Sequence, residues 1–142
     1  MRSILLVGSV GVGKTTLMQR LHDREVGYAK TQAMETHDNV IDTPGEFLES
    51  PFYKNALTLA SYDVDTVVLV QAADLRGTRF PPFYSTAFNR EVIGVVTKCG
   101  LPGNRRDHAV AHLKLAGAGK VFCVDSVSGE GLDALKAELC RP

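Results

Sequence analysis

Residues 4–16, Ile4-Leu5-Leu6-Val7-Gly8-Ser9-Val10-Gly11-Val12-Gly13-Lys14-Thr15-Thr16, decide the fold of this chain. Four apolar residues that end at a glycine predict a buried strand, and the apolar spacing of Leu17, Met18 and Leu21 predicts an amphipathic helix. The complete pattern G-x-x-x-x-G-K-T stands between them. A loop held between a strand and a helix N-terminus can surround a polyphosphate with free backbone N–H groups and the positive end of the helix dipole. The stretch therefore predicts a phosphate-binding loop.

This loop suggests a role for each of its fixed positions. Its glycines allow tight dihedral angles and a close approach of the backbone to a ligand. Lys14 is expected to reach the β- and γ-phosphates, and the Thr15 hydroxyl is expected to ligate Mg²⁺. A glycine-rich turn that binds nothing is the alternative, and the agreement of both flanks disfavours it. The nucleotide-binding residues predicted here are Gly8, Ser9, Val10, Gly11, Val12, Gly13, Lys14, Thr15 and Thr16.

The bulk composition indicates a soluble cytosolic protein. Lys and Arg number 16, as do Asp and Glu, so no charge excess suggests a nucleic-acid or membrane surface. Cys99, Cys123 and Cys140 are odd in number and lack CxxC spacing, which favours a reducing compartment over a disulfide frame or a zinc site. No run approaches the ~20 apolar residues that span a bilayer. We expect a single nucleotide-binding domain over residues 1–142.

Short apolar runs alternate with helical patterns along the chain. This alternation predicts an α/β fold, a three-layer doubly wound and mostly parallel sheet with nucleotide at the carboxyl edge of the strands. The expected strands are 4–7, 32–36, 40–42, 66–71, 92–97 and 120–124, and the expected helices are 14–22, 52–61, 84–88, 105–116 and 132–139.

A second motif, Asp42-Thr43-Pro44-Gly45, follows the short strand 40–42. In phosphate-loop proteins a carboxylate at the end of a neighbouring strand holds Mg²⁺, usually through water. Asp42 has that position, and the backbone N–H of Gly45 can sense the γ-phosphate. The same four residues would also make an ordinary turn, but their place after a complete phosphate loop favours the nucleotide site.

Four further segments carry a family resemblance. Residues 30–35 (KTQAME), 41–49 (IDTPGEFLE), 92–98 (VIGVVTK) and 116–122 (AGAGKVF) resemble the small ethanolamine- and propanediol-utilisation GTPase-like proteins of the EutP/PduV type. The resemblance covers nearly the full chain and implies a Ras-like P-loop NTPase fold of reduced size, Mg²⁺, and GTP or ATP. It also implies a cytosolic protein associated with bacterial microcompartments, with a shell or enzyme partner and a homodimer left open. A phosphotransferase role on acetate has been proposed within this family.

The base-reading motif of GTPases, N/T-K-x-D, is incomplete in this chain, which has Thr97-Lys98-Cys99-Gly100. Lys98 can lie along the base and Thr97 can brace the loop. The carboxylate that would accept two hydrogen bonds from guanine is missing at Gly100, and we expect no nearby acid to replace it because Asp107 lies inside the next helix. Losing such a contact lowers selectivity by orders of magnitude, so GTP and ATP both remain open. A plain strand end is the alternative interpretation of Thr97-Lys98.

Ser126-Val127 matches the S-A-x loop of GTPases only partly. A backbone N–H of this pair is expected to face the purine oxygen, although the following Ser-Gly-Glu-Gly-Leu can equally be a turn and helix cap.

Two further positions follow from the Ras-like resemblance. Thr31, sixteen residues after Thr15, is expected to complete the Mg²⁺ shell, with Thr36 as the competitor. A solvated loop threonine without a role in metal binding is the alternative. Glu46 stands where Ras-like enzymes carry the water-orienting Gln, so Lys14 and Glu46 are the expected catalytic residues. A carboxylate beside phosphate charge costs Coulomb energy, which predicts slow turnover. The sequence thus leaves three hypotheses, namely a slow NTPase switch, an ATP-dependent phosphotransferase resembling acetate kinase, and a non-catalytic docking module.

Overall fold

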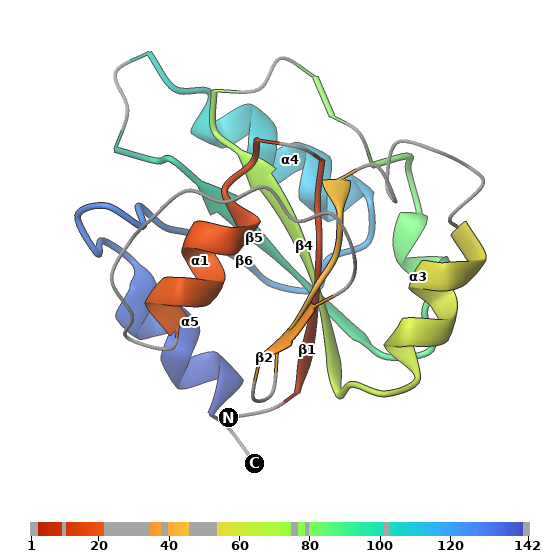
Figure 1. The fold of residues 1–142 in the computed structure, drawn as a ribbon. Helices are drawn as coiled ribbons and strands as arrows, with labels where there is room; N and C mark the ends of the chain where they lie inside the picture. Colours follow the sequence, from red (N-terminus) through yellow and green to blue (C-terminus); the bar gives the residue numbers. More distant parts are fainter. Residues whose placement is uncertain are drawn as a thin grey trace.

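A six-stranded sheet forms the centre of the protein, with strand order β2-β3-β1-β4-β5-β6 (Figure 1). The computed structural model describes residues 3–9, 11–21, 35–37, 40–45, 54–74, 77–78, 80–100 and 103–140. The strands are β1 (Ile4–Val7), β2 (Glu35–His37), β3 (Val40–Asp42), β4 (Thr66–Ala72), β5 (Glu91–Thr97) and β6 (Val121–Cys123). The helices are α1 (Lys14–Leu21), α3 (Lys54–Ser61), α4 (Arg106–Leu115) and α5 (Leu132–Leu139), with a 3-10 turn η2 (Tyr84–Ala87).

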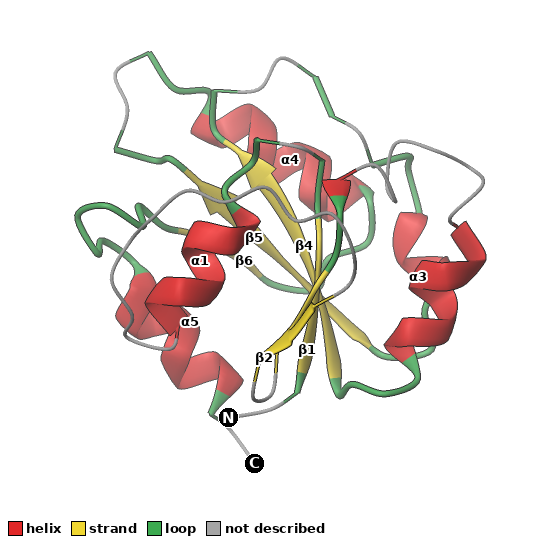
Figure 2. Ribbon diagram, viewed as in Figure 1, coloured by secondary structure: helices red, strands yellow, loops and turns green. Residues whose placement is uncertain are grey.

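Helices cover both faces of this sheet, α1 and α5 on one side and α3 and α4 on the other (Figure 2). Side chains alternate along a strand, so Ile4 and Leu6 of β1 pack toward the α1/α5 face while Leu5 and Val7 pack toward the opposite one. This confirms the predicted three-layer, doubly wound α/β fold. All neighbouring strands run parallel except β2, which pairs antiparallel with β3 at the edge of the sheet.

Strand β1 lies at the point where the chain order reverses, because β3 pairs with one of its edges and β4 with the other. In open α/β sheets such a switch point leaves a crevice outside the carboxyl ends of the strands, where ligands bind. The predicted phosphate loop leaves β1 at that edge. The topology therefore puts it at the centre of the edge where a ligand is expected.

The observed element boundaries differ from the predicted ones by a few residues. Helix α4 spans Arg106–Leu115, one residue shorter at each end than the predicted 105–116, because Arg105 and Ala116 are its capping residues. At its start Asn104 Oδ1 accepts a hydrogen bond from the Arg106 N–H. The predicted edge strand 32–36 is found as β2 at Glu35–His37, and residues 32–34 lie outside the described residues. Residue 22 of the first predicted helix and residues 52–53 of the second also lie outside them. Among the described residues no helix has the length and apolar character to cross a membrane.

Candidate functional site

The turn after β1 tolerates only glycine at its first position. A Cβ at Gly8 would lie 2.7 Å from the Val70 carbonyl oxygen of β4 and 2.8 Å from Val12 Cγ2, well inside van der Waals contact. Gly11 and Gly13 have φ angles of 84° and 92°, a region that residues with a side chain seldom adopt. The glycine spacing therefore serves both close packing against β4 and a reversal of the backbone.

Lys14 opens helix α1 and bends back over this loop. Its side chain is buried, and its Nζ donates a hydrogen bond to the Ser9 carbonyl oxygen at 3.3 Å. The Val12 N–H donates to the same carbonyl at 3.4 Å, so one oxygen holds the loop closed from two directions. A buried ammonium in the first turn of a helix is an arrangement that favours an anion.

The two motifs meet at Thr15 and Asp42. The Thr15 hydroxyl donates to Asp42 Oδ2 at 3.1 Å, although 27 residues separate them. Asp42 is fully buried at the end of β3, where it pairs with Leu6 of β1, and the Thr43 hydroxyl donates to the Leu6 carbonyl oxygen at 2.7 Å. A hydroxyl and a carboxylate are the hard oxygen ligands that Mg²⁺ prefers, so this donor set fits the expected ion.

Three predicted site residues, Val10, Thr31 and Glu46, lie outside the described residues. Gly45 is described and buried, and Thr16 is half-buried in the first turn of α1. In the described ranges, no group of three or more His, Cys, Asp and Glu side chains could hold a metal ion. Of the three Mg²⁺ ligands predicted from sequence, Thr15 and Asp42 lie among the described residues and Thr31 does not.

A second loop, residues 97–100 and hereafter the base loop, contacts the phosphate loop. The Thr97 hydroxyl donates to the Val12 carbonyl oxygen, and Lys98 Nζ donates to the Gly11 carbonyl oxygen at 2.8 Å. Lys98 has a φ of 61°, in the left-handed region that non-glycine residues rarely enter. The Thr97 hydroxyl thus joins the base loop to the phosphate loop, and the Lys98 side chain forms a second link between them.

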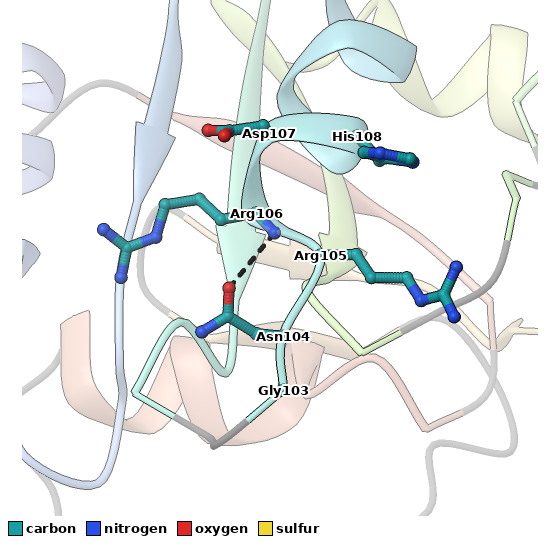
Figure 3. Close-up of a pocket in the computed structure, with 6 residues that line it drawn as sticks. All are labelled: Gly103, Asn104, Arg105, Arg106, Asp107 and His108. Carbon is teal, nitrogen blue, oxygen red and sulfur yellow. Dashed lines mark hydrogen bonds between the residues drawn. The ribbon is translucent and has the colours of Figure 1, made fainter.

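Residues at the start of helix α4 and just before it also hold the base loop in place. The Cys99 carbonyl oxygen accepts hydrogen bonds from Asn104 Nδ2 at 2.9 Å and Arg106 Nη2 at 3.0 Å. Asn104 and Arg106 also line an open hollow at the start of α4, where the Arg106 N–H donates to Asn104 Oδ1 (Figure 3). Burial raises the pKa of the Cys99 thiol to about 11, with neighbouring Cys123 adding to the effect. The thiol is thus a neutral, buried part of the loop at neutral pH.

The turn between β6 and α5 places Asp125 against the base loop. A Cβ at Gly100 would overlap Asp125 Oδ2, and it would lie 3.1 Å from Asp125 Cγ. The expectation that no acid is close to Gly100 is therefore wrong. Asp107 is close in the sequence but belongs to α4, whereas Asp125 follows β6, the parallel neighbour of β5. The shared carboxyl edge of two adjacent parallel strands was the signal that could have identified it.

The predicted pair Ser126 and Val127 adjoins this carboxylate. The Val127 N–H donates to Asp125 Oδ1 at 2.9 Å, while the Val127 side chain is 82% exposed. The Ser126 side chain is buried, and within the described part of the chain its hydroxyl has no hydrogen-bond partner. The helix that follows begins after Gly131, which has a φ of 79°, without a side-chain cap. The residues from Ser126 to Gly131 form the expected turn, but no side chain caps the helix. A role of Ser126 and Val127 in base contact stays a prediction.

Sequence comparison connects the whole chain with one family. The family model described as "Ethanolamine utilisation - propanediol utilisation" (PduV-EutP) matches residues 1–141. The propanediol utilization protein PduV of Citrobacter freundii is 38% identical over 136 residues, covering 95% of this chain and 91% of PduV. The probable acetate kinase EutP of Escherichia coli K12 is 38% identical over 104 residues, covering 72% of this chain and 65% of EutP.

Structure comparison supports the same fold. A crystal structure of Era in complex with MgGDPNP and nucleotides 1506–1542 of 16S ribosomal RNA superposes with a TM-score of 0.64 at 18% identity. The match covers 96% of this chain and 54% of that one. At this identity the likeness shows a shared fold.

Proposed function

This chain belongs to the ethanolamine- and propanediol-utilisation (PduV-EutP) family, and from that premise we propose that it is a Mg²⁺-dependent purine nucleoside triphosphatase of low turnover. The observation that carries the proposal is the hydrogen bond between the Thr15 hydroxyl and Asp42 at 3.1 Å, beside the closed phosphate loop. It unites a hydroxyl and a carboxylate at a helix N-terminus, as binding of a metal-chelated polyphosphate requires.

The phosphate loop, residues 8–15, and Asp42 together form what we call the phosphate cradle, and its residues have separate tasks in this proposal. The backbone amides of residues 11–15 and the Lys14 ammonium neutralise the β- and γ-phosphate oxygens. Thr15 and Asp42 would hold Mg²⁺, which when bound would offset charge on those oxygens. Gly45, three residues after Asp42, offers its N–H to the γ-phosphate. In a nucleotide-dependent switch, segments 23–37 and 43–53 would respond to whether that phosphate is present, and most of both segments lies outside the described residues.

Slow hydrolysis follows from the residues expected around the attacking water. Glu46 would stand beside the γ-phosphate, where its negative charge opposes the charge of the transition state. Val10 occupies a loop position that a small residue fills when an arginine of a partner approaches. We therefore expect no large stimulation by a partner arginine, which raises turnover about 10³- to 10⁵-fold where it operates.

Phosphate transfer to acetate is the second candidate function. It is favoured by the 38% identity with EutP of Salmonella typhimurium, which is named a probable acetate kinase. A non-catalytic docking module is the third, and it would keep the cradle without measurable turnover. In line with the family name, the protein is proposed to work in ethanolamine or propanediol catabolism, in the cytoplasm at a bacterial microcompartment. A shell or enzyme component is its expected partner, and a homodimer is a further assembly to test.

Single-turnover assays with γ-labelled ATP and GTP, with and without acetate, test these candidates. Release of inorganic phosphate supports the NTPase, and label in acetyl phosphate supports the kinase. Bound nucleotide that stays intact through many hours supports the docking module. Lys14→Ala is expected to abolish nucleotide binding in every case, whereas Lys136→Ala in helix α5 is a lysine control outside the cradle. Unchanged affinity in Lys14→Ala would place the phosphate site elsewhere.

A further inference from the structure

The carboxylate of Asp125 occupies the space that a side chain at Gly100 would need. A Cβ there would overlap Oδ2 and would lie only 3.1 Å from Cγ and 3.7 Å from the Asp125 Cβ. Gly100 is exposed and lies outside the set of glycines with positive φ. Its backbone would therefore accept another residue, and the three atoms nearest to an added Cβ all belong to Asp125. Glycine at position 100 therefore leaves room for the Asp125 carboxylate.

The turn itself holds this carboxylate in one orientation. Oδ1 accepts hydrogen bonds from the Val127 N–H at 2.9 Å and the Ser128 N–H at 3.3 Å. The Asp125 N–H donates to the Glu130 carbonyl oxygen at 2.9 Å, and the Gly129 N–H donates to the Asp125 carbonyl oxygen at 2.8 Å. Oδ2, in contrast, receives no hydrogen bond from the described residues. One oxygen fixes the side chain and the other keeps its capacity to accept.

The base loop fixes the position of Asp125 relative to the phosphate cradle. The Cys99 N–H donates to the Val124 carbonyl oxygen at 3.2 Å, which joins the base loop to the residue before Asp125. Thr97 and Lys98 join the same loop to the carbonyl oxygens of Val12 and Gly11. A nucleotide whose phosphates lie in the cradle would therefore meet Asp125 at a fixed distance along the site.

We propose that Asp125 is the specificity-determining residue of this site and that it selects guanine nucleotides, in place of an acid at position 100. The inference rests on the proposed nucleotide-binding function. An ionised carboxylate only accepts hydrogen bonds. Guanine presents two donors on one edge, N1–H and the 2-amino group, whereas adenine presents an acceptor at N1 and no amino group at C2. Since the Val127 N–H is used by Oδ1, the Ser126 N–H is the donor of that pair assigned to the guanine 6-oxygen.

The test compares the affinities of GDP, XDP and ADP at fixed Mg²⁺ for the full chain and for Asp125→Asn. Wild type is expected to bind GDP more tightly than ADP. Asparagine keeps the Oδ1 acceptor that orders the turn, but it replaces the second acceptor by a donor. GDP affinity is expected to fall about 10- to 100-fold. XDP affinity is expected to rise, because xanthine carries an oxygen where guanine carries the 2-amino group. ADP affinity is not expected to fall, because the new donor would face the N1 acceptor of adenine.

Two further variants separate base reading from structural damage. Gly100→Ala keeps every charge but pushes the carboxylate away, so it is expected to lower GDP affinity without raising XDP affinity. Asp133→Asn removes the same charge from an exposed position in the first turn of α5 and is expected to change neither. Thermal unfolding of each variant checks that the fold is kept.

The outcomes distinguish this inference from the function on which it rests. Equal binding of ADP and GDP by wild type, or an equal loss of all three nucleotides in Asp125→Asn, would overturn the role of Asp125 and leave the phosphate site standing. An absence of binding by every nucleotide in wild type would overturn both.

Discussion

Removing the hydroxyl of Thr97 would measure how much its hydrogen bond between the base loop and the phosphate loop stabilises the protein. Thr97 ends β5 and is 2% exposed, and its hydroxyl donates to the Val12 carbonyl oxygen of the phosphate loop. Replacing it by valine keeps the branched shape but removes the donor. A buried acceptor that loses its partner costs about 1–3 kcal/mol. We expect Thr97→Val to lower the free energy of unfolding by that amount.

Thr66 at the start of β4 provides a matched control. It is 1% exposed, and its hydroxyl has no hydrogen-bond partner within the described part of the chain. Thr66→Val makes the same chemical change, but here it removes a polar group that is buried without a hydrogen bond. Such a group costs about 1–3 kcal/mol, so this variant is expected to be neutral or more stable than wild type.

Urea unfolding followed by circular dichroism measures both variants. A difference of about 1 kcal/mol between them corresponds to a few degrees in melting temperature for a domain of this size. The Thr97→Val protein is also expected to bind nucleotide more weakly, because the phosphate loop loses an anchor, whereas Thr97→Ser is expected to retain both properties. Equal destabilisation by the two valine variants would refute the assignment, since burial alone would then explain the effect.

Three other predictions concern the same region. Gly8→Ala is expected to destabilise the protein by about 1–3 kcal/mol through overpacking against β4, while Gly119→Ala, whose Cβ would lie 3.8 Å from its nearest contact, should be tolerated in the same urea assay. Asp42→Asn is expected to abolish the Mg²⁺ dependence of nucleotide affinity, and calorimetry with and without the ion would contradict this if the dependence persisted. Iodoacetamide at pH 8.5 is expected to modify exposed Cys140 and to spare Cys99, whose pKa is raised to about 11 by burial, as peptide mass spectrometry would reveal. Because the native state keeps the Cys99 proton when the unfolded chain has lost it near pH 9, the stability contributed by this group falls as pH rises from about 9 to about 11.

Much of the site could be predicted from consecutive residues. The strand, loop and helix of residues 4–21 follow from apolar spacing and from three glycines, because these features act within one or two turns of chain. Their backbone angles and the buried Lys14 agree with that prediction. Sequence also placed Asp42 at a strand end, which is enough to predict a metal ligand but not its distance from Thr15.

The contacts that join the site are between residues far apart in the chain, and only the packed sheet decides them. Thr97 reaches Val12 across 85 positions because β5 and β1 both flank β4 and end at the same edge. Asp125 reaches Gly100 for the corresponding reason, since β5 and β6 are parallel neighbours, whereas Asp107 is nearer along the chain. Local sequence determined which groups could bind phosphate, because the glycines set the backbone angles of the loop and the apolar spacing set the strand and helix on either side of it. Strand pairing determined which acid faces the base loop, because proximity in a folded sheet depends on strand order and not on sequence separation.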